Sequence, residues 1–312
     1  MSFSRFQLWI LGLLTIVWGL NWPVMKLGIS GEFPPLFFRT LSLWLGLPVL
    51  ALGLKWLKVP FLIPRQHWRE LFWLAVFNMF IWHGTMILAV TLLSSGRAAI
   101  LGYTMPIFSA LIGAVFFQAA LSRRSWIGVL AACIGVSLLL WHEFSSLTGK
   151  PLGVLLALLA ASTWALGTQM LRRTTMPVPT LALSFWMTAM TAIVMTILTT
   201  SFERDAWRAP STANLAGIAY NAVLVFGFAH AAWFYLARSL PPVASTLSVM
   251  FIPVLGVFAG AVWLGEQLHW QDYASTALMV VAIGSVLLPT KKPPIKSSAD
   301  SKADNPNSAI PP

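Results

Sequence analysis

Residues 250–266 read Met250-Phe-Ile-Pro253-Val-Leu-Gly256-Val-Phe-Ala-Gly260-Ala-Val-Trp-Leu-Gly265-Glu266. This apolar run has a proline near its start and two glycines four positions apart, and it ends on a glutamate. The segment that lies 147 positions earlier reads Tyr103-Thr-Met-Pro106-Ile-Phe-Ser109-Ala-Leu-Ile-Gly113-Ala-Val-Phe-Phe117. A proline falls on the proline and two small residues fall on the two glycines, so the chain contains an internal duplication.

The composition indicates a membrane protein. Of the 312 residues, 58% are hydrophobic and 9% are charged, and the mean hydropathy is +0.78, whereas about a quarter of the residues in a soluble domain are charged. Long unbroken apolar runs are typical of membrane-spanning helices rather than of the short alternating strands of a barrel. The net charge of +11 does not indicate nucleic-acid binding, because the basic residues lie between apolar runs and form no stripe.

We therefore predict an all-α integral membrane protein with ten transmembrane helices, separated by glycine, proline and charge clusters. The predicted spans are residues 6–25, 35–54, 71–93, 97–119, 125–142, 152–171, 179–200, 214–237, 243–264 and 272–289. Residues 290–312, which are rich in Lys, Ser, Pro and Asp, form a predicted disordered cytoplasmic tail. The first span lacks a small-residue cleavage site, so it is interpreted as a retained helix. The single cysteine, Cys133, excludes an intramolecular disulfide and is expected to be a small buried side chain.

Lys and Arg are distributed unevenly between alternate loops. If the N-terminus lies in the cytoplasm, fourteen of the 20 basic residues fall on that side and six on the other. Cytoplasmic loops are enriched in Lys and Arg, so both termini are predicted to be cytoplasmic. The duplicated loops carry charges suited to opposite faces, because Arg123 and Arg124 follow the fourth span whereas Trp270, Gln271 and Asp272 follow the ninth.

Two further pairs of spans align at nearly the same offset. Trp18 matches Trp164 in the first and sixth spans, and His83 matches His230 in the third and eighth. The two predicted copies, of five spans each, are residues 5–142 and 152–289. Because five is odd, the second copy enters the membrane upside down, which predicts an inverted repeat with a pseudo-twofold axis in the membrane plane. Inverted repeats are typical of secondary transporters, whose halves move around a site at the membrane midplane.

Three segments carry a resemblance to a known family. They are Trp18-Gly-Leu-Asn21, Pro34-Pro-Leu-Phe-Phe-Arg39, and the block from Pro253 to Leu264-Gly-Glu266. In this order and spacing, over residues 5–289, they resemble two units of the EamA group of the drug/metabolite transporter superfamily. The resemblance implies an inner-membrane transporter, commonly an exporter of amino acids or other small metabolites. Family members often carry Leu-Gly-Glu after the fourth span too, where this chain has Phe117-Gln118-Ala119.

Polar and aromatic residues at membrane depth are candidates for a substrate site, because polar groups there are costly and usually functional. His83 and His230 could donate hydrogen bonds or change protonation near neutral pH; the alternative is a bond to a neighbouring helix backbone. Trp18 and Asn21 share a helix face, and aromatic walls bind flat or amphipathic solutes and cations. The predicted substrate-binding residues are Trp18, Asn21, Trp82, His83, Tyr103, Trp164, His230 and Trp233.

A second group of residues is predicted to act in gating or in packing. Pro106 and Pro253 each free a backbone carbonyl and allow a kink, and small residues four apart let helices approach closely. Arg39 could pair with a substrate carboxylate or snorkel to the end of its helix. Glu266 is expected to cap or pair with a neighbouring helix rather than to contact substrate. The predicted gating or structural residues are Arg39, Pro106, Pro253, Gly256, Gly260 and Glu266.

Several motifs are absent from the sequence. No Asp or Glu lies deep in any span, so proton coupling would have to use a histidine, and otherwise the substrate moves down its own gradient. No phosphate loop, His-Glu-x-x-His metal site or Gly-x-Ser-x-Gly elbow occurs. We therefore expect no cofactor, no metal, no nucleic-acid partner and no catalytic residues.

These observations predict a carrier of a small amphipathic metabolite in the bacterial inner membrane, working by alternating access. Export of amino acids is the leading hypothesis. A lipid or lipid-linked sugar flippase of the same architecture is the alternative, and a membrane enzyme is disfavoured. The expected partners are a small-molecule substrate and the lipid bilayer. A monomer would suffice, and the sequence leaves the oligomeric state, the direction of transport and its coupling open.

Overall fold

The computed structural model describes residues 5–117, 123–145, 150–239 and 251–287, and all of its regular elements are helices. The predicted tail, residues 290–312, lies outside these ranges. The first half contains α1 (Arg5–Gly28), α2 (Pro35–Trp56), η1 (Arg65–His67), α3 (Trp68–Ala75), η2 (Val76–Phe80), α4 (Ile81–Leu92), α5 (Ser95–Gly102), α6 (Met105–Phe117) and α7 (Arg123–Ser145). The second half contains α8 (Pro151–Arg173), α9 (Thr180–Phe202), η3 (Arg204–Ala206), α10 (Thr212–Tyr220), η4 (Asn221–Ala229), α11 (His230–Ser239), α13 (Phe251–Leu264) and α14 (Trp270–Leu287).

Within the described residues, seven helical stretches are long and apolar enough to cross a membrane. They are Arg5–Gly28, Pro35–Trp56, Arg65–Leu92, Ser95–Phe116, Pro151–Arg173, Thr180–Phe202 and Thr212–Ser239. Two shorter apolar helices, Trp126–Leu138 and Ile252–Leu264, fall within the fifth and ninth predicted spans. The prediction of an all-helical, multi-pass membrane protein is therefore confirmed, while the count of ten spans stays a prediction.

Local sequence explains where several helices begin and end. Proline occupies the first turn of α2 and of α8, where a missing N–H costs nothing. Ser211 and Asn214 form a reciprocal capping box at the start of α10. Gly265 follows α13 with φ +64°, a conformation that glycine adopts without steric cost and that commonly ends a helix.

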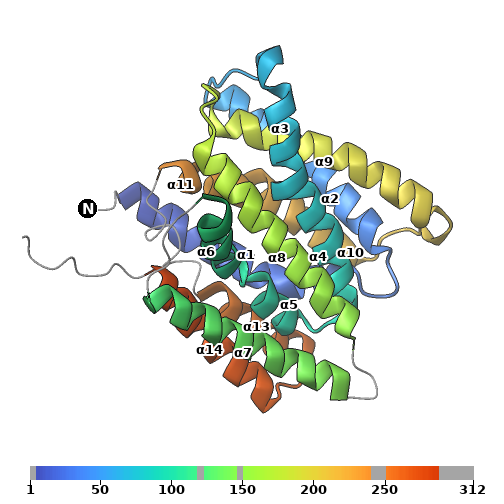
Figure 1. The fold of residues 1–312 in the computed structure, drawn as a ribbon. Coiled ribbons are helices and arrows are strands. Elements are labelled where there is room, and N and C mark those ends of the chain that lie inside the picture. The colour runs from blue at the N-terminus through green and yellow to red at the C-terminus, as the bar shows by residue number, and fades with distance from the viewer. Residues whose placement is uncertain (1–4, 118–122, 146–149, 240–250, 288–312) are drawn as a thin grey trace, which may run out of the picture.

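The packing of the helices has an internal symmetry that follows the duplication (Figure 1). Three pairs of equivalent spans contact each other: α2 contacts α9, the fourth span contacts the ninth through α5 and α13, and α7 contacts α14. The other main contacts occur in matched pairs. Helix α1 packs on α13 and on α10–η4, just as α8 packs on α5–α6 and on η2–α4. Each repeat thus packs mainly against helices of the other repeat, so the two repeats share one interface, and the centre of the molecule lies at that interface.

The two copies of the first helix run in opposite directions. The Nζ of Lys26, near the end of α1, donates to the carbonyls of Val90 and Leu93 at the end of α4. Gly153, near the start of α8, lies against the side chain of Leu93. The end of α1 and the start of α8 therefore meet at the same end of α4, as an inverted repeat predicts.

The outer surface is apolar and carries aromatic residues near the helix ends. Trp9, Trp56 and Trp270 are 80%, 85% and 65% exposed, which suits the interfacial belt that Trp forms in membranes. Cys133 is also exposed, on the surface of α7. The expectation of a buried cysteine was therefore wrong, because α7 packs mainly against α14 and Cys133 lies on a part of the helix that these contacts leave uncovered.

Candidate functional site

The centre of the molecule contains two wide helical turns that precede the two histidines. Segments η2 and η4 are π-helical and interrupt the third and eighth predicted spans before His83 and His230. π-Helical turns are rare and often occur at functional sites. Buried Asn78 and Asn221 each donate to a carbonyl four residues earlier, in the last turn of the helix that precedes the π-helical segment. The sequence analysis missed both π-helices, for which a mid-span asparagine is the available signal.

His83 and His230 face each other in the interior, with 3.1 Å between their Nε2 atoms. Both side chains are buried. The Nδ1 of His230 lies 2.8 Å from the carbonyl oxygen of Val225, which can only accept, so this nitrogen carries the proton. In the neutral pair, the Nε2 of His230 then accepts from the Nε2–H of His83. The Nδ1 of His83 is left as an acceptor without a partner among the described residues.

Tryptophans surround the histidine pair. Trp18 and Trp164, which the duplication relates, lie 6.1 Å apart between ring centroids, and each lies within 5.7 Å of the His230 ring. Trp82 packs at 4.9 Å from Trp164 on one side, and Trp233 packs at 5.7 Å from Trp18 on the other. These edge-on and tilted contacts form an aromatic wall around the two imidazoles.

A cavity lies against this wall and brings together most of the predicted substrate-binding residues. Seven of the eight line it, namely Trp18, Asn21, Trp82, His83, Tyr103, Trp164 and His230. The eighth, Trp233, is not in the lining and supports Trp18 from behind. The sequence analysis did not name five further lining residues: Trp22, Met25, Met86, Met105 and Val225.

The cavity is small in this conformation. Its volume is about 30 Å³, room for a few waters at most, since one water needs roughly 10–15 Å³ of such volume. A metabolite would enter only if the helices separated or the aromatic side chains turned aside. The geometry therefore corresponds to a contracted state of the site.

Arg39, predicted as a gating or structural residue, lies in the cavity wall. It is the fifth residue of α2 and is 1% exposed. Its Nη1 donates to the Oδ1 of Asn221 at 3.0 Å, and its Nη2 lies 2.8 Å from the sulfur of Met25. The rings of Phe38 and Phe226 lie within 5.9 Å of the guanidinium carbon. The side chain is thus held inside the protein and does not snorkel to the helix end.

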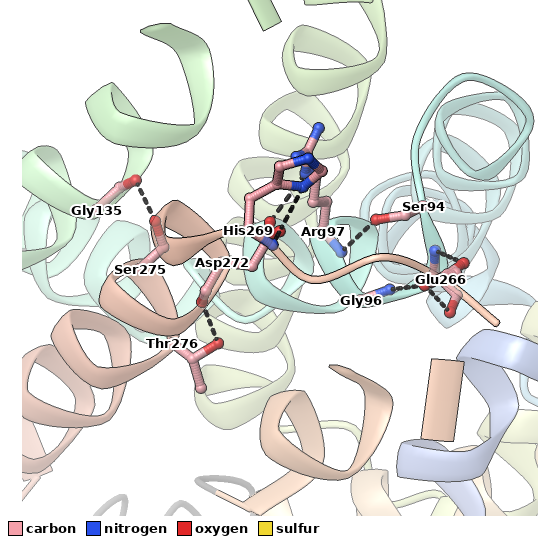
Figure 2. Close-up of polar contacts among 10 residues, drawn as sticks. Ser94, Gly96, Arg97, Gly135, Glu266, His269, Asp272, Ser275 and Thr276 are labelled. Atoms are coloured by element: carbon pink, nitrogen blue, oxygen red, sulfur yellow. Dashed lines mark hydrogen bonds and ion pairs between the residues drawn. The ribbon is translucent and has the colours of Figure 1, made fainter. Parts of the chain in front are cut away.

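Glu266 caps a helix, as the sequence analysis expected (Figure 2). Its carboxylate accepts hydrogen bonds from the backbone N–H of Ser95 at 2.7 Å, the hydroxyl of Ser95 at 2.9 Å and the backbone N–H of Gly96 at 3.2 Å. These groups start α5, where unpaired N–H groups favour a negative charge. Beside this cap, Arg97 pairs with Asp272 at 2.9 Å, so α5 is joined to both sides of the α13–α14 turn.

Gly256 and Gly260 permit close contact of α13 with its neighbours. Gly256 lies against Ala99 of α5 and Trp22 of α1, and Gly260 lies against Ser95 and Glu266. A side chain at either position would meet these atoms. The two glycines therefore allow α13 to pack closely on α5, so that Glu266, just after α13, reaches the start of α5.

Pro106 does not lie in the middle of a helix. Pro106 is the second residue of α6, after a break at residues 103–104 that separates α6 from α5. Pro253 is the third residue of α13, and residues 240–250 before it are outside the described ranges. Pro106 thus stands in a first turn, where the missing N–H is tolerated. The predicted kink takes the form of a broken helix in the first copy.

Further side-chain bonds tie the helices together at the end of the molecule that carries Glu266, hereafter the Glu266 end. Glu203, at the end of α9, accepts from the backbone N–H groups of Leu36 and Phe37 at the start of α2. Asn214 of α10 donates to the carbonyl of Gly28 at the end of α1. Together with the Glu266 cap, these bonds close this end of the helix bundle.

Comparison with known proteins places this architecture in a family. The EamA-like transporter family matches residues 6–141 and, a second time, residues 151–288. The uncharacterized transporter YoaV of Bacillus subtilis is 25% identical to the chain, with 82% of this chain and 87% of YoaV covered. The uncharacterized inner membrane transporter YedA of Escherichia coli K12 is 26% identical, with 89% and 91% covered. A crystal structure of a protein has the same fold, with a TM-score of 0.66 at 21% identity over 89% of this chain and 97% of that chain.

The two family matches coincide with the two halves that pack against each other in the structure, and they leave between them only the connection from α7 to α8. The two matches together cover most of the chain. This multi-pass membrane protein belongs to the EamA-like transporter family.

Proposed function

We propose that the protein is a secondary transporter that exports small amphipathic metabolites, amino acids foremost, across the bacterial inner membrane by alternating access. The observation that carries the proposal is the buried His83–His230 pair, set in a tryptophan-lined cavity at the interface of the two repeats. A mostly apolar cavity with a few convergent polar groups is the usual form of a small-molecule site. Its place between the repeats is where inverted-repeat transporters bind their substrates.

The proposal includes ten transmembrane helices with both termini in the cytoplasm. The remaining three helices, α7, α13 and α14, would complete the seven long apolar stretches. In this orientation the Glu266 end faces outward, so the structure corresponds to a state that is closed to the outside. Opening outward would break the Glu266 cap and the Glu203 contacts while the two repeats rotate about the histidine pair.

Uptake into proteoliposomes tests the function directly. Purified wild-type protein would be reconstituted with a panel of labelled amino acids, with and without a pH gradient. We expect accumulation of one class, and loss of that activity in Trp18→Ala and His83→Ala. Trp126→Ala, which removes an exposed tryptophan of α7 that does not line the cavity, is the matched control and should transport normally.

The outcomes separate the candidate functions. Accumulation that depends on the pH gradient would assign proton coupling to the histidine pair, the titratable couple at the centre of the cavity. If no amino acid accumulates, the leading substrate class is wrong. A parallel assay for exposure of labelled lipid headgroups would then test the flippase alternative with the same liposomes.

A further inference from the structure

The cavity wall contains a positive charge that the protein itself leaves without an opposite charge. Arg39 is buried, and it forms no ion pair with a carboxylate within the ranges that the structure describes. In the sequence, the acidic residues all lie outside the central parts of the predicted spans: Glu32, Glu70, Glu143, Glu203, Asp205, Glu266, Asp272, Asp300 and Asp304. A guanidinium in a low-dielectric interior is costly unless an anion or several strong acceptors compensate it.

The present partners of Arg39 use only part of its hydrogen-bonding capacity. A guanidinium has five N–H donors and no acceptor. Asn221 accepts from Nη1 at 3.0 Å, but Nη2 meets only the thioether of Met25, which is a weak acceptor. The Nε has no partner among the described residues. The edge formed by Nε and Nη2 is the one that binds a carboxylate with two parallel hydrogen bonds, and both Arg39 and Met25 line the cavity.

Other cavity residues offer hydrogen-bond partners and apolar surface for the rest of the solute. The Oδ1 of Asn21 and the Nδ1 of His83 are buried acceptors without partners in the described part of the chain. The Nε1 of Trp164 is an unpartnered donor. Tryptophan faces supply the apolar surface. A buried polar group normally has a partner, so this group of unpaired atoms around one cavity indicates places where a ligand binds.

We propose that Arg39 is the specificity-determining residue of this site and that it binds the carboxylate of the transported solute through its Nε–Nη2 edge. The inference deepens the proposed function by naming the substrate class: small solutes with one carboxylate and an apolar or aromatic body. On binding, the carboxylate replaces the Met25 sulfur at Nη2 and supplies the missing negative charge. Solutes in which the carboxylate is an amide or is absent lack that interaction and are rejected.

Matched ligands test the proposal. The probes are phenylalanine and 3-phenylpropionate, which carry a carboxylate, and phenylalaninamide and 2-phenylethylamine, which do not. Binding to full-length protein in detergent is followed by quenching of intrinsic tryptophan fluorescence, and transport by uptake into proteoliposomes. For the wild type we expect at least one carboxylate probe to bind roughly tenfold or more tightly than the two amines that lack a carboxylate, the size of a hydrogen-bonded charge contact.

Three variants separate ligand binding from a structural role. Arg39→Gln should lose the preference for carboxylates, whereas Arg39→Lys, which keeps the charge but not the fork, should retain part of it. Asn221→Ala removes the protein partner of Arg39 and should keep the preference. Thermal unfolding in detergent shows whether each variant is folded.

Each outcome decides the matter. Carboxylate-selective binding without transport would support the anion site and overturn the proposed function. Transport that treats carboxylates and amides alike would leave the function standing and overturn the anion site. Failure of every probe to bind, or a preference that is unchanged in Arg39→Gln or lost equally in Asn221→Ala, would also overturn it.

Discussion

His83 and His230 have unequal roles although the duplication relates them. His230 makes two hydrogen bonds, to the Val225 carbonyl and to His83, whereas His83 makes the one between the rings. The side chains next to them are unequal as well, because the position of Trp82 in the first copy is Ala229 in the second. A pseudo-symmetric framework therefore holds an asymmetric site, which a substrate with two different ends requires.

The hydrogen-bond pattern predicts unequal effects of the two alanine substitutions on stability. His230→Ala would remove two side-chain hydrogen bonds: it would leave the His83 donor without an acceptor, and the Val225 carbonyl would keep only its bond from the backbone N–H of residue 230. His83→Ala would remove one hydrogen bond and leave one acceptor of His230 unpaired. Each unsatisfied buried group costs about 1–3 kcal/mol, so His230→Ala should lower the free energy of unfolding more. Thermal unfolding in detergent measures the difference, and the double variant should cost less than the sum of the two. Equal and additive effects would contradict the tautomers assigned here.

At the scale of elements, the fourth and ninth segments show how small residues shape the closed Glu266 end. Helix α13 packs on α5 along Gly256 and Gly260, which brings the loop after it to the start of α5. The Glu266 carboxylate then accepts hydrogen bonds from the first N–H groups of α5, which have no acceptor within the helix. The break between α5 and α6 keeps α5 to eight residues, and Ser94 and Glu266 together cap its start.

Gly260→Ala should weaken this arrangement. Its added methyl group would meet the Ser95 hydroxyl and the Glu266 carboxylate, so α13 must shift away from α5. Overpacking of this kind costs about 1–3 kcal/mol, and we expect a lower midpoint in thermal unfolding. Gly12→Ala in α1 is the control, because nothing lies within 4 Å of its added carbon and alanine favours a helix. An unchanged midpoint for Gly260→Ala would show that the cap does not depend on this close contact.

At the scale of the whole molecule, helices of each repeat pack on helices of the other repeat. The bundle therefore has one common centre and two opposite ends. The Glu266 end is closed by Glu266, Glu203 and Asn214, each of which bonds to the backbone end of a helix from another segment. The opposite end is tied by Arg238, which donates to the carbonyls of Met176 and Val178. Because the sets of bonds differ, the two ends are expected to open with different free-energy costs.

The proposed orientation in the membrane can be tested by cysteine labelling in intact cells. In a Cys133→Ser background, Arg204→Cys at the Glu266 end should react with a membrane-impermeant maleimide from outside. Gln66→Cys, between α2 and α3, should react only after the cells are made permeable. Both native side chains are exposed, so access is limited by the membrane alone. The reverse labelling pattern would invert the orientation, and with it the side to which this state is closed.

The sequence by itself determined the membrane class, the duplication and most of the cavity residues. Apolar composition is a property of the chain alone, and a duplication places Trp18 opposite Trp164 and His83 opposite His230 in any fold that keeps the symmetry. Glu266 was also predictable as a cap, because it ends an apolar segment. Such features follow from residue type and spacing.

Only the tertiary structure decided how those residues meet. The π-helical segments η2 and η4 set the histidines face to face, and periodicity does not reveal an extra residue in a helical turn. The burial of Arg39 depends on α10–η4 covering α2, a contact between residues 182 positions apart. Exposure of Cys133 likewise follows from which helices cover α7. These properties arise from contacts between residues far apart in the sequence, which cannot be inferred from composition or from local patterns.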